Sequence, residues 1–296
     1  MVISVLALGL FAADLTGIWV SSTLTPMERG VTYDFNDKKI VVPVPNRLTV
    51  TDAEAQLYEK GLINAMSYRR GDKSEGDVSG ELNPDFIAFP HELTRIAGKK
   101  RTSLIVDPPD GMIPYKLSEA ERDALAKSAP KKDGYRAFNS AERCLFTGFS
   151  GPPLMPFFDA MIFEIVQTPE HVMITMEGFH EVRVVRIGGK HLPAAVKQWN
   201  GDSIGHWEGG TLVVDTTNFN GKWPGGGEHL HVVERFTRID PKTILYRATT
   251  EDSTLYSRPW TIEYTLQAGD RIYEYACHEG NYALPAMIKA RAASEK

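Results

Sequence analysis

The stretch LHVVERFTRIDPKTILYRATTED, residues 230–252, decides the fold. Apolar and polar residues alternate over 230–239 and again over 243–252, and the turn-forming triplet DPK, 240–242, joins the two runs. Alternation places one face of a strand against a core, and a short turn joins antiparallel neighbours. The stretch therefore predicts a β-hairpin with one buried face.

The same pattern extends outward from this hairpin. Most of the links between the alternating runs are short and rich in Gly, Pro or Asp, which is typical of an antiparallel meander. The expected strands are 157–167, 171–187, 199–207, 211–219, 230–239, 243–252, 258–267 and 271–278. The run 171–187 is too long to stay straight, so a bend is expected at Gly178. About eight strands in a meander can close a barrel. The sequence thus predicts a mainly β protein, an antiparallel meander closed into a lipocalin-like barrel.

The first half of the chain predicts helices and short strands instead of a meander. Two capping boxes, Thr51 with Glu54 and Ser118 with Glu121, predict helices that extend to about residues 62 and 129. Short strands are expected at 14–20 and 103–106, the second running into a turn at 107–111. We expect one domain over 14–296, in which an N-terminal segment of strands, helices and loops (14–156) packs on the meander (157–282) and a tail (283–296) follows.

Composition narrows the class of protein. The 296 residues carry a net charge of −5 without a basic stripe, which argues against a nucleic-acid partner, and no run is long enough to span a membrane. Residues 1–13 form an apolar run ending in small residues, so they resemble a signal-peptide remnant and predict a periplasmic or secreted protein; a buried first strand is the alternative. Cys144 and Cys277 then form a disulfide or remain two buried thiols.

Ionisable residues on apolar strand faces are the catalytic candidates, because a buried charge is costly unless it is paired or used. Glu234 shares a face with Val232 and Phe236, and His180 lies among valines. We expect His180 and Glu234 to act as acid and base. The supporting residues are expected to be Glu177 as the orienting group, with Arg183 or Arg235 stabilising an anion. A hydrogen-bonded structural histidine is the alternative for His180.

Aromatic and basic residues at strand ends predict a pocket rim for a small apolar or aromatic molecule held inside the barrel. The candidates are Trp207, Trp223, Trp260, Tyr273, Tyr275, Arg247, Arg258 and His231. No nucleotide-binding fingerprint is present, so no cofactor is expected.

Two short motifs offer other chemistry. His229 and His231, at i and i+2, are a spacing that can present two metal ligands. With Glu234 they resemble the HxH…E pattern of cupins, but Glu234 follows too closely and faces the other way. Residues 201–205 match GxSxG, yet they lie between strands rather than between a strand and a helix, so Gly201-Asp202 is interpreted as a turn.

Two resemblances bear on the fold. LTGIW, 15–19, resembles the GxW that opens the first strand of lipocalins. The runs IVDPPDG (105–111), ERC (142–144), GDSIGHWEGGTLVVDTTNF (201–219), VVERF (232–236), RPW (258–260) and YEYACHEGNY (273–282) resemble a large family of exported bacterial β-rich proteins. That resemblance implies a shared fold and export and assigns no activity.

The main hypothesis is an exported small-molecule enzyme that uses acid–base chemistry, of isomerase, lyase, cyclase or hydrolase type. The alternatives are a non-catalytic, lipocalin-like carrier of a hydrophobic ligand and a metal-dependent hydrolase that uses His229 and His231.

Overall fold

The computed structural model describes residues 13–30, 32–35, 38–41, 46–69, 92–128, 134–146, 151–156, 162–222, 226–279 and 281–294. Two of the sequence predictions fall outside these ranges. They are the signal-peptide remnant, apart from Ala13, and the pocket residue Trp223.

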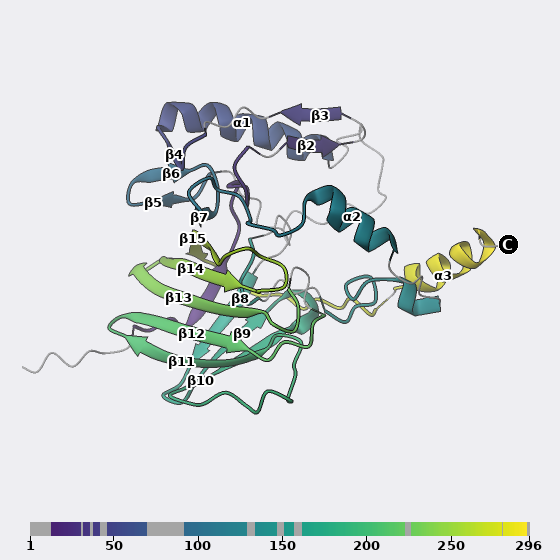
Figure 1. Ribbon diagram of the computed structural model, residues 1–296. Helices are drawn as coiled ribbons and strands as arrows, with labels where there is room; N and C mark the ends of the chain where they lie inside the picture. The colour runs from purple at the N-terminus through teal and green to yellow at the C-terminus, as the bar shows by residue number, and fades with distance from the viewer. Residues whose placement is uncertain are drawn as a thin grey trace, which may run out of the picture.

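Nine of the described strands close into a barrel, which confirms the predicted fold (Figure 1). The closing strand is β1 (Gly17–Val20), because it pairs with both β8 and β15. The remaining barrel strands are β8 (Ile162–Gln167), β9 (His171–Met176), β10 (Val182–Ile187), β11 (Asp202–Glu208), β12 (Thr211–Thr217), β13 (His231–Asp240), β14 (Thr243–Glu251) and β15 (Trp260–Ala268). The hairpin predicted from residues 230–252 is the β13–β14 pair.

The path of the chain differs from a simple meander at three points. The run 171–187 reverses instead of bending, because Phe179 and His180 adopt left-handed φ angles of 61° and 52° in the 3₁₀ turn η3 (Gly178–His180). Strands β10 and β11 are parallel, so residues 188–201 must return to the end of the barrel where β10 began. Residues 271–276 form no strand, since β1 and β7 (Ile105–Asp107) occupy the free edge of β15.

Large side chains fill the barrel. Phe236, Tyr246 and Tyr264 point inward with no exposed surface, and their neighbouring ring centroids lie 5.1 Å apart. A void large enough for water would leave accessible surface on the side chains around it, and these have none. The interior around these residues is therefore a packed core rather than a ligand cavity.

A smaller layer covers the outer face of β15 (Figure 1). It consists of α1 (Asp52–Arg69) and a sheet of β4 (Thr49–Val50), β6 (Lys99–Arg101) and β5 (Arg95–Ile96), with a separate two-stranded sheet of β2 (Thr32–Phe35) and β3 (Lys38–Val41). Its own core contains Leu24, Val50, Ala55, Tyr58, Leu62 and Leu93. The layer is joined to the barrel by a hydroxyl contact of 3.0 Å between Thr94 and Thr265 and by an ion pair of 2.9 Å between Arg101 and Glu263. The predicted helix and loop layer is thus present.

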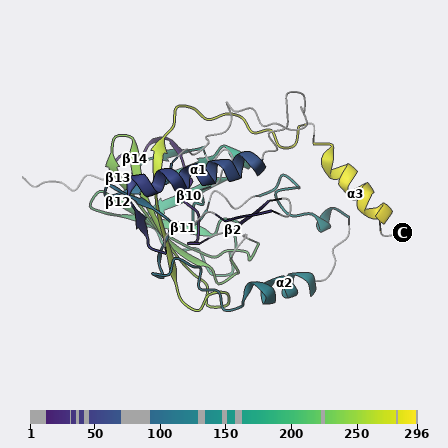
Figure 2. The ribbon, with the colours of Figure 1, turned by 90° about the horizontal axis from the view of Figure 1, so that it is seen from above.

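Both predicted capping boxes are confirmed. Thr51 exchanges hydrogen bonds with Glu54 at the start of α1, and Ser118 does so with Glu121 at the start of α2 (Glu119–Ser128). The α2 helix buries none of its residues and projects from the barrel, as does α3 (Ala283–Ser294) (Figure 2).

Of the two alternatives for the cysteines, the structure has the disulfide. Cys144 and Cys277, 133 residues apart, are bonded to one another, so no free thiol remains at these positions. The bond fixes the segment after β15 to the one that contains the 3₁₀ helix η2 (Gly134–Ala137). In the described part of the chain, no helix is long and apolar enough to cross a membrane.

Candidate functional site

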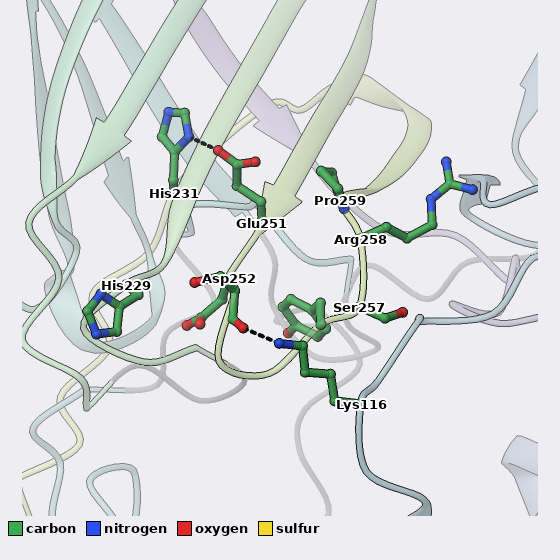
Figure 3. Close-up of a pocket in the computed structure, with 10 residues that line it drawn as sticks. Lys116, His229, His231, Glu251, Asp252, Ser257, Arg258 and Pro259 are labelled. Atoms are coloured by element: carbon green, nitrogen blue, oxygen red, sulfur yellow. Dashed lines mark hydrogen bonds and ion pairs between the residues drawn. The ribbon is translucent and has the colours of Figure 1, made fainter.

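A pocket with a volume of about 410 Å³ opens at the end of the barrel where β13 begins and β14 ends (Figure 3). The loop 252–259, which leads into β15, forms most of its wall, and Lys116 closes one side. The lining residues are Lys116, His229, His231, Glu251, Asp252, Ser253, Tyr256, Ser257, Arg258 and Pro259. The volume is within the range of small-molecule sites, and most of the lining residues are polar or charged.

His231 is the best-positioned acid–base group of this pocket. It faces Glu251 across the β13–β14 ladder, and the two side chains point toward one another (Figure 3). Its Nδ1 lies 2.5 Å from Oε1 of Glu251. Its Nε2 lies 3.1 Å from Oδ1 of Asp215 on β12. The hydrogen bond with Asp215 raises the pKa of His231 to about 9, burial opposes this, and Glu251 adds to it. The imidazole is therefore a cation at neutral pH.

The same Asp215 oxygen also lies 3.0 Å from Nε2 of His191, in the connection between β10 and β11. Nδ1 of His191 lies 3.0 Å from Asp202, which accepts two hydrogen bonds from Arg186 at 2.8 and 3.1 Å. Carboxylates and basic side chains thus alternate from β14 to β10 on the outer face of the barrel. Burial opposes the ionisation of Asp202, yet hydrogen bonds led by that of Arg186 lower its pKa to about 2.

The pocket loop is held by a buried carboxylate. Asp252 accepts hydrogen bonds from the amides of Gly227 at 2.9 Å and Thr254 at 2.8 Å, and from the Thr254 hydroxyl at 2.6 Å. Across the opening, Nζ of Lys116 donates to the carbonyl of Ser253 at 2.5 Å. These contacts fix both sides of the pocket without using His231 or Glu251.

The predicted catalytic pair is not brought together. His180 is exposed on the turn between β9 and β10, whereas Glu234 is buried in the barrel. The prediction that His180 lies on an apolar strand face is wrong because the chain reverses at Gly178 and moves His180 off the strands. Glu177 instead accepts a hydrogen bond of 2.7 Å from the amide of Tyr273, and its burial raises its pKa. Tyr275 packs on Phe179 nearby, with ring centroids 5.0 Å apart.

Glu234 does face the core, as its alternation predicts. Its partner is Arg183, one of the residues assigned to anion stabilisation, and the two form a closed ion pair inside the barrel. Arg235 points outward and pairs with Glu208, 2.7 Å away. These contacts give Glu234, Arg183 and Arg235 structural partners.

The predicted ligand-binding residues lie in different parts of the structure and do not form one site. Arg247 pairs with Glu263 on the outer face of the barrel. Arg258 lines the pocket, but its guanidinium pairs with Asp107 at 2.9 Å and points away from His231 (Figure 3). Trp260 is buried in the main core and Trp207 packs against it. Of the predicted ligand-binding residues that the structure describes, His231 and Arg258 are the ones that line this pocket.

The described residues do not support the two motif-based alternatives, a metal site at His229 and His231 and a nucleophile in the GxSxG match. His229 lines the same pocket as His231, but its ring points away from it (Figure 3). Among the described residues, no group of three or more His, Cys, Asp or Glu side chains could hold a metal ion. Ser203 of the GxSxG match is buried and bonded to Thr216 at 2.8 Å, and Asp202 begins β11 instead of completing a turn.

Sequence reasoning missed Asp215 and Glu251 as hydrogen-bond partners of His231, and His191 as a second partner of Asp215. Alternation alone places Asp215 and His231 on the outer faces of consecutive strands, so this pair could have been predicted from the sequence. His191 reaches Asp215 because residues 188–201 return to the end of the barrel where β10 begins. The sequence carries no signal for this return.

Comparisons with protein-family models, with curated proteins and with solved structures find no match for this chain. The site is therefore interpreted from its own geometry.

Proposed function

We propose that the protein is an acid–base enzyme that acts on a small polar molecule bound in the pocket at the barrel end. The observation that supports this most is the position of His231, whose two ring nitrogens both contact carboxylates, one of which, Glu251, lines that pocket with it. Histidines oriented by a carboxylate are the commonest general acids and bases in enzymes.

The two groups that face the pocket, His231 and Glu251, have complementary roles. Asp215 binds Nε2 of His231 and so directs the Nδ1–H group toward the pocket, where Glu251 accepts its hydrogen bond. Glu251 is half-exposed, and only its Oε1 contacts His231, so its Oε2 can take a proton from a bound molecule. Both N–H groups of His231 are bonded to carboxylates, so His231 acts as the matching proton donor when a bound molecule takes the place of Glu251 at Nδ1. Removal of a proton at one position of a substrate and its return at another would be an isomerase reaction. Removal of the proton by Glu251 with protonation of a departing group by His231 would be an elimination, which is lyase chemistry.

The pocket changes the expected class of substrate from apolar to polar. An apolar ligand in the barrel is no longer favoured, because the inward-facing side chains fill the interior. The wall of the end pocket instead offers an ammonium group, two serine hydroxyls and the His231–Glu251 pair. A small molecule with several hydrogen-bonding groups suits such a wall better.

The disulfide supports the export that the N-terminal run predicts. Disulfides persist in oxidising compartments and are rare in the cytosol. We therefore place the proposed reaction in the periplasm or outside the cell.

Turnover of a metabolite extract tests the proposal. Wild-type protein, H231Q and E251Q are incubated with small-molecule extract from the source cells, and consumed compounds are followed by mass spectrometry. We expect at least one compound to be consumed by the wild type and by neither variant.

The matched controls are H206Q and E208Q. His206 and Glu208 form an exposed His–Glu pair like that of His231 and Glu251, but they lie at the end of β11 away from the pocket. Both controls should keep the activity. If H231Q and E251Q consume the same compounds as the wild type, the proposal is wrong. A compound that is retained but not altered would indicate the carrier hypothesis instead.

A further inference from the structure

We infer that Lys116 sets the substrate class of the pocket by binding an anionic group, a carboxylate or a phosphate, of the molecule held there. This inference rests on the proposed function in that it concerns the same pocket. It assigns Lys116 to binding and specificity, and leaves proton transfer to His231 and Glu251.

The origin of Lys116 in the chain is the first observation. Of the residues that line the pocket, Lys116 alone comes from the N-terminal segment, and the others lie between His229 and Pro259. In Figure 3 its side chain extends from a separate stretch of backbone toward the loop 252–259. The pocket therefore lies where the two parts of the chain meet, and the N-terminal part contributes a cation to it.

The backbone at Lys116 is held against this loop. The amide of Lys116 donates to the carbonyl of Leu255 at 2.9 Å, and the amide of Ser257 donates to the carbonyl of Pro114 at 2.8 Å. The two segments form a short antiparallel bridge between these bonds. Lys116 is thus already in place beside the pocket, which reduces the entropy that ligand binding costs.

The tip of the side chain is held as well. Nζ of Lys116 donates to the carbonyl of Ser253 at 2.5 Å. An ammonium group has three donors, so two remain for a bound molecule. Within the described part of the chain, no carboxylate forms an ion pair with this nitrogen. An anionic group of a ligand would supply the missing counter-charge through charge-assisted hydrogen bonds.

The other charged side chains of the wall already have charged or multiple partners. Asp252 accepts the hydrogen bonds that hold its own loop. Glu251 contacts His231, and Arg258 pairs with a carboxylate outside the lining. Among the lysine, arginine and carboxylate side chains that line the pocket, Lys116 is the one whose partner is a neutral carbonyl. It is therefore the group that selects the charge of the ligand.

The arrangement also separates binding from chemistry. Lys116 and the His231–Glu251 pair line one pocket from different elements of the structure. An anionic group bound at Lys116 would leave the rest of a small molecule in the space that Glu251 and His231 line. The expected substrate is therefore a small anion with an exchangeable or abstractable proton away from its charged group.

The test is a titration of ¹⁵N-labelled protein at pH 7 with sodium acetate and with inorganic phosphate, at constant ionic strength. The backbone amides of loop 252–259 are followed by NMR. Acetate presents a carboxylate and phosphate a phosphoryl group, so the tighter probe identifies the anionic group of the substrate. In wild-type protein we expect saturable shifts with a Kd of about 10 mM for the tighter probe, the weak affinity that so small a molecule allows.

Three variants separate charge from structure. K116Q keeps a donor for the Ser253 carbonyl but removes the charge, so we expect the affinity to fall about tenfold. K116R keeps the charge and should bind within about threefold of wild type. K242Q is the control, because Lys242 is an exposed lysine in the turn between β13 and β14 at the other end of the barrel. It should bind like the wild type.

Shifts that do not saturate in the wild type would overturn the inference, as would equal affinities in the wild type and K116Q. If K116Q and K116R lose binding alike, Lys116 matters for the shape of the loop and the inference is wrong. The titration needs no turnover, so its outcome is separable from that of the extract assay. In that assay, a consumed compound without an anionic group would contradict the role of Lys116 and leave the proposed acid–base reaction intact.

Discussion

Arg183 on β10 and Glu234 on β13 form a bidentate ion pair across the interior of the barrel. The two N–O contacts measure 2.5 and 3.0 Å, and the side chains are 2% and 0% exposed. The Tyr246 hydroxyl donates to the same carboxylate at 2.8 Å. Because β10 and β13 are not neighbours in the sheet, the pair fixes the two sides of the barrel relative to each other.

Glu234→Leu should destabilise the protein strongly, because it leaves the Arg183 cation buried without a counter-charge. Loss of one partner of a buried pair costs about 3–5 kcal/mol, whereas replacing both partners by apolar residues is often neutral. The double variant R183M/E234L should therefore recover most of the loss. Urea denaturation measures both, and a single variant within about 1 kcal/mol of wild type would show that the pair is not structural.

Stability should fall in acid as Asp202 is protonated. Its pKa is about 2 in the folded protein, against 3.8 for the ordinary side chain. A lowered folded-state pKa contributes stability that is complete above the unfolded value and is lost as the pH falls from about 4 toward 2. The contribution is of order 2 kcal/mol. Denaturation of wild type and D202N at pH 6 and pH 2.5 should show a difference that shrinks in acid. A difference that does not depend on pH would contradict this origin.

Removal of the disulfide should destabilise the protein without changing the barrel. The bond closes a loop that spans 133 residues of sequence, for which the chain-entropy model gives about 4–5 kcal/mol. We expect C144A/C277A to unfold at a lower urea concentration while its far-ultraviolet circular dichroism stays native. An unchanged midpoint would mean that the two joined segments contribute nothing to global stability.

The two capping boxes should differ in their effect on stability, although both follow the pattern of Ser or Thr with Glu three residues later. Helix α1 buries Ala55, Tyr58 and Leu62 in the second core, whereas α2 buries no residue. Loss of the cap in T51A should cost about 1 kcal/mol of global stability. S118A should leave global stability unchanged and only increase hydrogen exchange at the start of α2. Equal losses in urea would show that α2 is part of the cooperative unit.

Local patterns explain which parts of the fold could be predicted. Alternation and short turns identified β13 and β14, and the capping boxes located the starts of α1 and α2, because these signals depend on neighbours in the chain. The parallel pairing of β10 with β11 depends on a long return segment, and the reversal at Phe179 and His180 needs left-handed backbone at two non-glycine residues. The sequence carries no signal for the parallel return, and Gly178 predicts a bend but not a reversal.

The candidate site was predictable only in part for the same reason. Residue parity placed Glu234 in the core and His231 on the outer face, and both placements agree with the structure. Parity could not show that Arg183 would neutralise Glu234 from across the barrel. Nor could it show that loop 252–259 would form a pocket beside His231.

The protonation state of His231 tests the central claim, a carboxylate-held histidine at the pocket, most directly. In wild-type protein, ¹⁵N NMR should show both ring nitrogens protonated at pH 7, with a titration midpoint near the pKa of about 9. A midpoint near 6.5, the ordinary value, would mean that Asp215 and Glu251 do not hold the ring in solution, and the proposed acid–base site would have to be abandoned.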